Sequence, residues 1–302
     1  MVSDHARAGG ARVAVVMPCF NDGATIDEAV DSAVGPDQEE CELIVIDDGS
    51  TDPKTISAFD RLERRGVRIL HQPNLGAEVA RMNGVLETSA PYIFPLDADD
   101  ILVSGALAAL ADALDAHPEA AAAWGDGVTF GDTDVFQASY RRIDPWLLSY
   151  VNVLPGSGAF RRTKLLEVGG WTKKTEPGHE DWDIWMGFAE RHYAGVYVPV
   201  STLRYRVHGE RRARRAMKNH DAVFAELQKR HPLLFEQRHE NKKLSPAPWY
   251  LKIGIPLSTN LTFVPLRARL AFRNLLIDPK GVVRLAIGLR FSRAKRRLRR
   301  GS

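Results

Sequence analysis

The first hundred residues alternate between short apolar runs and amphipathic segments, and this alternation restricts the fold more than any other feature of the chain. Strands are expected at 13–20, 41–48, 67–72 and 92–96, the first of them buried on both faces, and helices at 25–34, 53–65 and 76–88. Because strand, helix and strand in succession favour parallel pairing, the pattern predicts an α/β fold with a mostly parallel central sheet and helices on both faces.

Beyond residue 100 the pattern becomes less regular. A helix is expected from 104 to about 116, a strand over 120–126, and a helix over 181–192 whose apolar positions 182, 185, 186 and 189 form one buried stripe. The Gly-rich stretch 127–178 is expected to form loops that cover a site. Thr25 and Glu28 have the spacing of a capping box at the start of the first helix.

Polar residues follow each of the four expected strands. They are Asn21 and Asp22, Asp47 and Asp48, Asn74, and Asp97, Asp99 and Asp100. In open α/β sheets ligands bind at the carboxyl ends of the strands, so these clusters are expected to meet at one edge of the sheet. No G-x-G-x-x-G follows the first strand, which disfavours a dinucleotide-dependent dehydrogenase.

The most acidic strand end is Asp97-Ala98-Asp99-Asp100. Carboxylates this close in sequence repel one another unless a cation offsets their charge. A turn can direct Asp97 and Asp99 at one hard cation, and Mg²⁺ or Mn²⁺ held by few protein ligands usually also binds substrate phosphates. The sequence predicts such a metal site. The alternative is a solvated loop in which Asp100 caps a turn.

Two other strand ends are candidates for binding a ligand. Asp48 precedes Gly49, which permits a tight turn, and its carboxylate can accept hydrogen bonds from N–H or hydroxyl groups of a ligand. Gly76 opens a helix that places Arg81 about one and a half turns later. Arg81 can reach a bound nucleotide or hold the Asp97 region, and the alternative is an arginine on the surface.

Candidate catalytic and metal-binding groups also occur later in the chain. Glu180 and Asp181 begin a helix, where a carboxylate can cap the helix, interact with its dipole, or take a proton from a hydroxyl group. His208 offers an imidazole ligand, although a lone histidine is more often structural.

Six segments in this order and spacing resemble one family. "VVMPCFNDG", "IVIDDGSTD", "NLGAEVARMNG", "PLDADD", "GGW" and "HEDWD" are together similar to the family 2 inverting glycosyltransferases of GT-A fold, over roughly residues 12–210. The resemblance implies that the first two strand ends hold a nucleotide. Pro18, Phe20 and Asp48 would contact the base, with Asp48 accepting a hydrogen bond from a pyrimidine N–H, and Gly76 and Arg81 would belong to the same nucleotide site.

The resemblance also assigns the chemistry. The Asp-x-Asp motif of the family matches Asp97 and Asp99, which implies a ribose contact for Asp97 and a metal contact for Asp99. The Glu-Asp motif matches Glu180 and Asp181 and implies that Asp181 is the catalytic base. His208 occupies the place of a further metal ligand. The segment 154–171 is similar to the acceptor side of the site, with the loop from Gly156 to Gly158 close to the sugar.

The implied reaction is a metal-dependent, inverting transfer of a sugar from a nucleotide-diphosphate sugar, with a UDP-sugar as the expected donor, to a hydroxyl of a glycan or lipid-linked glycan. Mn²⁺ or Mg²⁺ is the implied cofactor. A glycoside hydrolase also pairs carboxylates but needs neither nucleotide nor metal. A catalytically silent module that binds sugar nucleotides or polysaccharides is the alternative from another class, and it predicts binding without turnover.

The net charge of +3 hides an acidic body and a basic tail, because residues 201–302 hold 25 Lys/Arg but 6 Asp/Glu. We expect a GT-A domain over 12–210, a helical segment over 211–244 that packs on it, and a basic amphipathic extension over 245–302 joined by "SPAP". An apolar stripe at 282, 285, 286 and 289 before "RFSRAKRRLRR" favours an anionic membrane surface over nucleic acid. The alternative is a helical subdomain.

The cellular location follows from the same features. Cys19 and Cys41 lie next to expected buried strands, which indicates reduced thiols in the cytoplasm. The sequence contains no run of 18 successive apolar residues, so no transmembrane helix is expected. The expected location is therefore peripheral, on the cytoplasmic face of the cell membrane.

Overall fold

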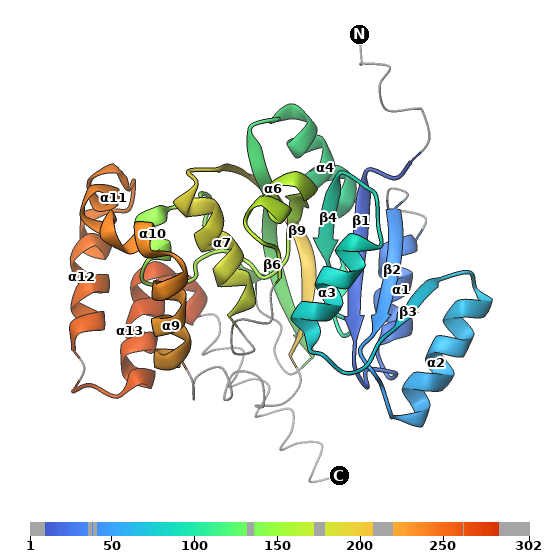
Figure 1. Cartoon of the computed structure of the whole chain (residues 1–302). Helices are drawn as coiled ribbons and strands as arrows, with labels where there is room; N and C mark the ends of the chain where they lie inside the picture. Colours follow the sequence, from blue (N-terminus) through green and yellow to red (C-terminus); the bar gives the residue numbers. More distant parts are fainter. Residues whose placement is uncertain are drawn as a thin grey trace. The chain divides into compact units, whose positions relative to one another are not determined.

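The computed structural model describes residues 10–35, 38, 41–131, 136–171, 179–207, 220–261 and 263–283. The chain divides into two compact units that interleave along the sequence (Figure 1). The first unit contains Met1–Gly125, Ser157–Lys173 and Gly195–Leu203, and the second contains Asp126–Gly156, Lys174–Ala194 and Arg204–Ser302. Strands β6 (Ala120–Gly131) and β9 (Ala194–Val207) each contribute residues to both units.

Four parallel strands form one half of the sheet of the first unit, and they are the four that the sequence predicts. β1 (Val13–Cys19) lies between β2 (Cys41–Asp47) and β4 (Tyr92–Pro95), and β3 (Arg68–His71) pairs with β2. Beyond β4 the strand order continues through β8 (Ala159–Arg161), β6, β9 and β5 (Ile101–Leu102). All seven residues of β1 are buried, as expected for a strand covered on both faces.

Helices cover both faces of this half of the sheet. They are α1 (Ile26–Val34), α2 (Pro53–Arg64), α3 (Ala77–Leu86) and α4 (Ala106–Ala116), at or near the predicted positions. Residues of α1 and α4 share a core cluster with Val13, Val15 and Met17. On the opposite face α3 comes so close that a Cβ at Gly84 would lie 2.4 Å from Val16 Cγ1. The predicted α/β class is confirmed.

The predicted capping box at the start of α1 is wrong. Thr25 is the N-cap residue, but its side chain caps no N–H of the helix. The Thr25 hydroxyl donates instead to the carbonyl oxygen of Asp22, at 3.2 Å. The β1–α1 turn therefore competes successfully for the hydroxyl, as short polar side chains often bond to nearby backbone groups.

The stretch 127–178 is more regular than predicted. It contains β7 (Phe136–Gln137), α5 (Pro145–Leu148), β8 and α6 (Arg162–Glu167). The three residues of β8 pair antiparallel with β4 and with β6. Phe160 of β8 is 1% exposed and meets Trp171 edge to face, with ring centroids 5.8 Å apart. A strand this short has no period of its own, so its partners decide its conformation.

The second unit is mainly helical. Its helices include α7 (Glu180–Glu190), α9 (His220–Arg230), α10 (Pro232–Glu236), α11 (Arg238–Leu244), α12 (Trp249–Asn260) and α13 (Leu266–Ile277). The predicted stripe of α7 is buried, since Trp182, Trp185, Met186 and Ala189 are at most 3% exposed. Asp183 of the same helix pairs with Arg230 at 2.5 Å and with His231 at 2.8 Å.

The predicted linker at 245–248 is packed into this unit. Ser245 is 7% exposed and donates its hydroxyl to Asp144 Oδ2 at 2.6 Å. Leu251 and Ile255 of α12 share a core cluster with Trp146, among others. These contacts favour the helical subdomain for residues 245–283. Of the apolar stripe at 282, 285, 286 and 289, all but Val282 lies outside the described residues.

Candidate active site

The loop after β1 is tied to the loop after β2. Asn21 has a positive φ of 61°, and its Oδ1 accepts hydrogen bonds from the backbone N–H groups of Thr51 at 2.8 Å and Asp52 at 2.9 Å. The N–H of Asn21 donates in turn to Ser50 Oγ at 3.1 Å. Two strand ends of the expected site are therefore joined by one amide side chain.

Asp48 fixes the turn that leads into α3. Its carboxylate accepts from the N–H of Leu75 at 2.8 Å, from the N–H of Gly76 at 2.9 Å and from Gln72 Nε2 at 2.7 Å. Asn83 of α3 donates to Gln72 Oε1 at 2.7 Å and so holds Gln72 in place. Asp48 is 3% exposed, so these bonds lie in a largely dry environment.

The bonds of Asp48 bear on its predicted contact with a base. A carboxylate has about four lone-pair sites. Oδ1 accepts from Gln72 and Leu75, and Oδ2 accepts from Gly76. One lone pair on Oδ2 therefore remains for a ligand N–H, and the direct contact stays a prediction.

Gly76 is needed for its backbone conformation. It is the N-cap of α3 with φ 100° and ψ 155°, a region that residues with a Cβ rarely adopt. Its N–H is directed at Asp48 rather than left for a ligand. The predicted helix start at this glycine is confirmed, and its place in a nucleotide site stays a prediction.

A negative potential surrounds the end of β1. Burial, together with the carboxylates of Asp22, Asp47 and Asp99, raises the pKa of the Cys19 thiol to about 12. Asp47 itself accepts from the N–H of Ser50 at 2.8 Å and lies 2.9 Å from His71 Nδ1. The acidic groups from three strand ends therefore act on one thiol, as the predicted convergence requires. No disulfide joins the two cysteines.

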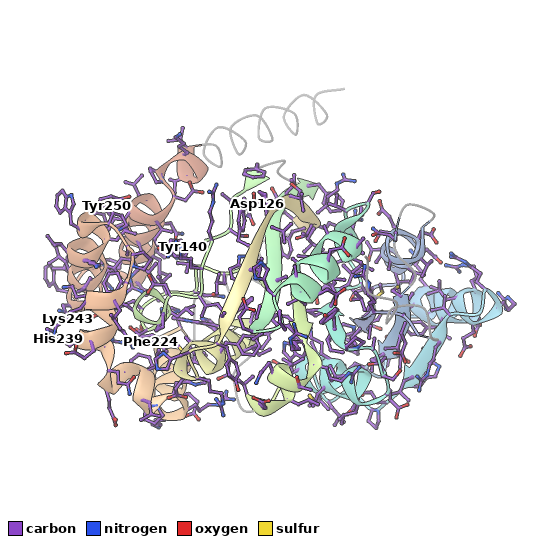
Figure 2. All side chains as sticks on the ribbon, turned by 90° about the horizontal axis from the view of Figure 1, so that it is seen from above. Asp126, Tyr140, Phe224, His239, Lys243 and Tyr250 are labelled. Atoms are coloured by element: carbon purple, nitrogen blue, oxygen red, sulfur yellow. The ribbon has the colours of Figure 1, made fainter. Side chains whose placement is uncertain are left out.

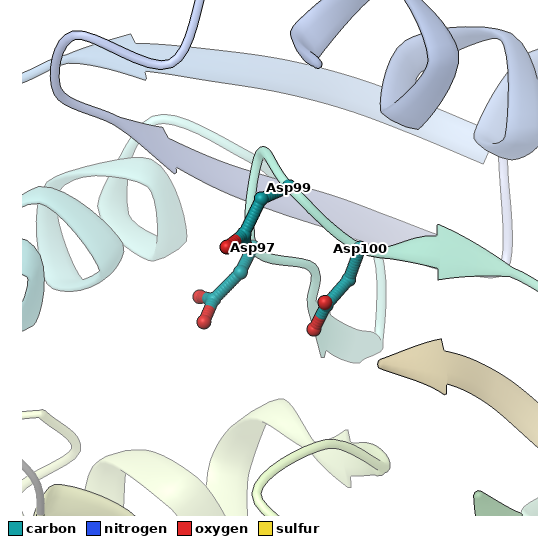
Figure 3. A group of neighbouring side chains, drawn as sticks. All are labelled: Asp97, Asp99 and Asp100. Atoms are coloured by element: carbon teal, nitrogen blue, oxygen red, sulfur yellow. The ribbon is translucent and has the colours of Figure 1, made fainter. Parts of the chain in front are cut away.

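The acidic cluster after β4 consists of Asp97, Asp99 and Asp100. One carboxylate oxygen from each residue lies within 4.8 Å of the other two, and all three side chains point to the same side of the loop (Figure 3). The turn is closed by a bond from the N–H of Asp100 to the carbonyl oxygen of Asp97, at 3.0 Å. Asp100 is 3% exposed.

The cluster fits a hard cation. Opposite ligands of Mg²⁺ lie about 4.2 Å apart, twice the ideal metal–oxygen distance of about 2.1 Å. At most one pair among three ligands can be opposite, and neighbouring ligands lie about 3.0 Å apart at this metal–oxygen distance. Oxygens within 4.8 Å of one another therefore have to approach by up to about 2 Å, which rotation of the side chains can supply. Carboxylates are also the ligand type that Mg²⁺ and Mn²⁺ prefer.

Arg81 offsets part of the negative charge of the acidic cluster. Its Nη2 lies 2.6 Å from Asp97 Oδ1, and the two side chains are 7% and 21% exposed. Of the three placements that the sequence left open, the structure shows Arg81 holding the Asp97 region. Asp97 is thereby oriented by a buried cation, which leaves Asp99 as the carboxylate better suited to a metal.

Asp181 lies in the second unit, in the first turn of α7. The N-cap position belongs to His179, so neither Glu180 nor Asp181 is the N-cap residue. A Cβ at Gly156 would lie 2.7 Å from Asp181 Oδ2, so the loop before β8 approaches the carboxylate closely because residue 156 is glycine. Trp185 anchors this loop by donating from Nε1 to the carbonyl oxygen of Pro155 at 2.9 Å.

An aromatic stack stands beside Asp181. Trp182 stacks on His179, with ring centroids 5.9 Å apart, and on Phe224 at 5.5 Å (Phe224 is labelled in Figure 2). His179 Nε2 lies 3.3 Å from Nδ1 of His220. Burial, together with the neighbouring His179, lowers the pKa of His220 to about 4, and burial also lowers the pKa of His179, so this pair is neutral at pH 7. The start of α7 is therefore held by packing rather than by ion pairs of these histidines.

The predicted site residues fall into three groups. Asp48, Gly76, Arg81, Asp97 and Asp99 lie at the strand ends of the first unit, together with Pro18, buried in β1, and Phe20, 45% exposed. Glu180 and Asp181 lie in the second unit. His208 lies outside the described residues.

The sequence places Asn21 at this edge of the sheet, but sequence reasoning missed Gln72 and Asn83 as organisers of the first group. The signal for Gln72 was an amide side chain directly after an expected strand, whereas Asn83 lies within α3 and gave no signal of its own.

Comparison with known proteins identifies the family. The model of glycosyl transferase family 2 matches residues 14–169, just over half of the chain. The chain belongs to this family. In this member the match includes β1 to β4 and the acidic cluster, whereas Glu180, Asp181 and His208 follow its last matched residue.

Two curated relatives of the family match part of the chain. A glycosyltransferase of Escherichia coli, YibD, is 34% identical over 90 residues, which are 30% of this chain and 26% of that protein. GalNAc(5)-diNAcBac-PP-undecaprenol beta-1,3-glucosyltransferase of Campylobacter jejuni is 33% identical over 103 residues, 33% of each chain. The chain thus matches about a quarter to a third of the length of these relatives.

A solved structure matches nearly the whole family 2 chain. The crystal structure of S. aureus TarS 1-349 in complex with UDP-GlcNAc has a TM-score of 0.57 at 15% identity, covering 95% of this chain and 92% of the other. At this identity the match shows the fold, and the predicted GT-A type of fold is confirmed.

Proposed function

We propose that the protein transfers a sugar from a nucleotide-diphosphate sugar, with a UDP-sugar as the expected donor, to a hydroxyl group of a glycan. The acidic cluster carries the proposal: three convergent carboxylates, one of them paired with buried Arg81, lie after a parallel strand of a family 2 chain. Such a cluster favours a bound cation, and a cation with open positions suits a diphosphate. The sequence of the C. jejuni relative, named as a glucosyltransferase, supports the same chemistry.

The donor would be bound by the strand ends of the first unit. The remaining lone pair on Asp48 Oδ2 would accept from a pyrimidine N–H, and the ring of Phe20, 45% exposed, would contact the base together with Pro18. Asp97, oriented by Arg81, would accept from a ribose hydroxyl. Asp99, with His208 as a further ligand, would hold Mn²⁺ or Mg²⁺, which when bound supplies positive charge to the departing diphosphate.

Asp181 would act as the catalytic base. In a single in-line displacement the acceptor oxygen bonds to the anomeric carbon while the bond from that carbon to the diphosphate oxygen breaks. The hydroxyl proton passes to the Asp181 carboxylate, and the anomeric configuration inverts. Gly156 leaves room for that carboxylate, and Glu180 would assist from the same helical turn.

We test the proposal by separating donor binding from transfer. Thermal melting with a panel of nucleotide sugars, with and without Mn²⁺, should show stabilisation by one nucleotide class that depends on the metal. Asp181→Asn should retain this stabilisation and lose transfer. Stabilisation without turnover in the wild-type protein, across a panel of glycan acceptors, would favour the silent binding module. Absence of stabilisation by every nucleotide sugar would refute the proposed donor.

We also propose that the protein works at a membrane surface, on a lipid-linked glycan. The support is the basic excess of residues 201–302 and the name of the C. jejuni relative, which specifies an undecaprenol-linked glycan for that enzyme. None of the helices in the described part of the chain has the length and hydropathy of a membrane span. Attachment from the cytoplasmic side would then be peripheral.

A further inference from the structure

An apolar stripe runs along one side of α12. Trp249, Ile253 and Leu257 recur every four residues, and their exposed fractions are 74%, 60% and 51%. Residues four apart lie on the same side of a helix. On the other side Leu251 and Ile255 are buried, at 4% and 0% exposed. Helix α12 is therefore apolar on two sides, although one of them is open to solvent.

Further exposed apolar side chains occur in the sequence before and after the helix. Leu244 precedes α12 and Phe263 follows it, and each is 82% exposed. Tyr250, which Figure 2 labels at the start of α12, is 42% exposed. Tryptophan and tyrosine combine an apolar ring with a polar group, and they are enriched where protein meets the membrane interface. We call Trp249, Ile253 and Leu257 the α12 face.

The charge around this face indicates what binds there. Residues 245–302 contain 13 Lys/Arg and one acidic residue, Asp278. Arg267 and Lys280, close to the face in sequence, are exposed. A second copy of the chain would bring the same positive charge to the contact, and like charges oppose such pairing. An anionic lipid surface supplies both an apolar interior and the opposite charge.

We propose that the α12 face docks on an anionic lipid bilayer. The twelve residues of α12 span about 18 Å and would lie in the plane of the interface, with the open side buried in the boundary between headgroups and acyl chains. The basic residues that follow hold the helix against the negative headgroups. This inference rests on the membrane location proposed above, replaces the stripe at 282–289 as the main apolar contact, and does not depend on the donor.

Vesicle binding by paired variants tests the proposal. Ile253→Ser/Leu257→Ser removes two exposed side chains from the face, and Ile56→Ser/Leu86→Ser removes two side chains of similar exposure, 47% and 65%, from the first unit. In sedimentation with phosphatidylglycerol-containing vesicles, the first variant should bind at least tenfold more weakly than the wild type. The control should stay within twofold. Both variants should keep the wild-type melting temperature, because all four side chains are exposed.

Trp249 provides a second measurement on the unmodified chain. All six tryptophans lie in the described residues, and the other five are at most 3% exposed, so acrylamide should quench mainly Trp249. Vesicles that contain phosphatidylglycerol should protect this emission, and Trp249→Phe should lose the protected component.

Four results would overturn the proposal. They are equal quenching with and without vesicles, unchanged binding of Ile253→Ser/Leu257→Ser, equal binding to vesicles of pure phosphatidylcholine, and a lipid-free dimer that this variant abolishes. Metal-dependent stabilisation by a nucleotide sugar is measured without lipid, so the donor proposal succeeds or fails separately.

Discussion

Replacing Gly156 by alanine should impair catalysis while leaving the fold intact. The added Cβ would lie 2.7 Å from Asp181 Oδ2, whereas ordinary van der Waals contact begins near 3.4 Å. The carboxylate must therefore move by about 0.7 Å, the difference between these two distances. A misplacement of about 1 Å at a reacting group can cost roughly a hundredfold in rate. We therefore expect kcat to fall by roughly 10- to 100-fold, or about 1.4–2.7 kcal/mol in the barrier.

The effect on stability should be small, for two opposing reasons. The contact is with the end of a flexible side chain, which can leave its rotamer at a cost of about 0.5–1.5 kcal/mol. Gly156 is not among the glycines of positive φ, so alanine fits the backbone and restricts the unfolded chain, a gain of about 0.4–1 kcal/mol. The free energy of unfolding should thus change by less than about 1 kcal/mol.

The assay compares transfer rate, donor binding and unfolding in one set of proteins. Gly156→Ala should show the lowered kcat with an unchanged metal-dependent melting shift on addition of the donor. Gly10→Ala is the control, because a Cβ at Gly10 has nothing within 4 Å. Wild-type kcat in Gly156→Ala would refute both the placement of the loop and the role of Asp181 that depends on it.

Four further predictions follow from the described contacts. Asp99→Asn should abolish the Mn²⁺-dependent part of the melting shift with UDP, because an amide replaces the carboxylate proposed to hold the metal. Asp48→Asn loses an acceptor, since an amide NH₂ would face the N–H of Gly76 or of Leu75 and Gln72, and urea unfolding should show a loss of about 1.5–3 kcal/mol. The pKa of His220 is lowered to about 4 in the folded protein, so the unfolded state takes up a proton first as the pH falls. The free energy of unfolding should therefore decline from about pH 6.5 toward pH 4. Melting curves of His220→Phe should show less of this decline. Burial keeps the Cys19 thiol neutral, so at pH 8 a thiol reagent should modify it only after unfolding, as a titration of reactive thiols in native and denatured protein will show.

The parallel half of the fold could be predicted from the sequence. Strands β1, β2 and β4 are runs whose side chains are mostly apolar, typical of a strand buried between two layers of helices, whereas β3, at the edge of the sheet, is exposed at both ends. The strands end within one or two residues of the expected positions. The local hydrophobic pattern is enough to predict such a buried strand, because all of its residues lie in the same apolar environment.

The rest of the fold depends on contacts between distant residues. Strand β8, Ala159–Arg161, is too short to show a period and owes its conformation to β4 and β6. The division into two interleaved units could not be predicted from local sequence patterns either, because single strands, β6 and β9, contribute residues to both units. The four residues at 245–248 have the composition of a linker, yet Ser245 finds its partner about a hundred residues away, at Asp144.

The candidate site shows the same limit. The carboxylates of Asp97 and Asp99 could be predicted from their position after a strand, and the pairing of Arg81 with Asp97 was one of three stated options. The bonds of Asp48 could not be predicted, because its partners are 24 to 28 residues away in the chain. Thr25 matched a known capping pattern, but a backbone carbonyl three residues earlier took its hydroxyl.

Helix α3 has a consequence for redesign of the enzyme. Its N-terminal turn is fastened to Asp48 through Gly76, and its middle is fastened to Asp97 through Arg81. A substitution that alters the proposed base contact would therefore tilt the helix that orients the acidic cluster. In a library of variants, changes in nucleotide preference should consequently be accompanied by changes in metal affinity. A variant that changes only one of these two properties will need a compensating substitution within α3 itself.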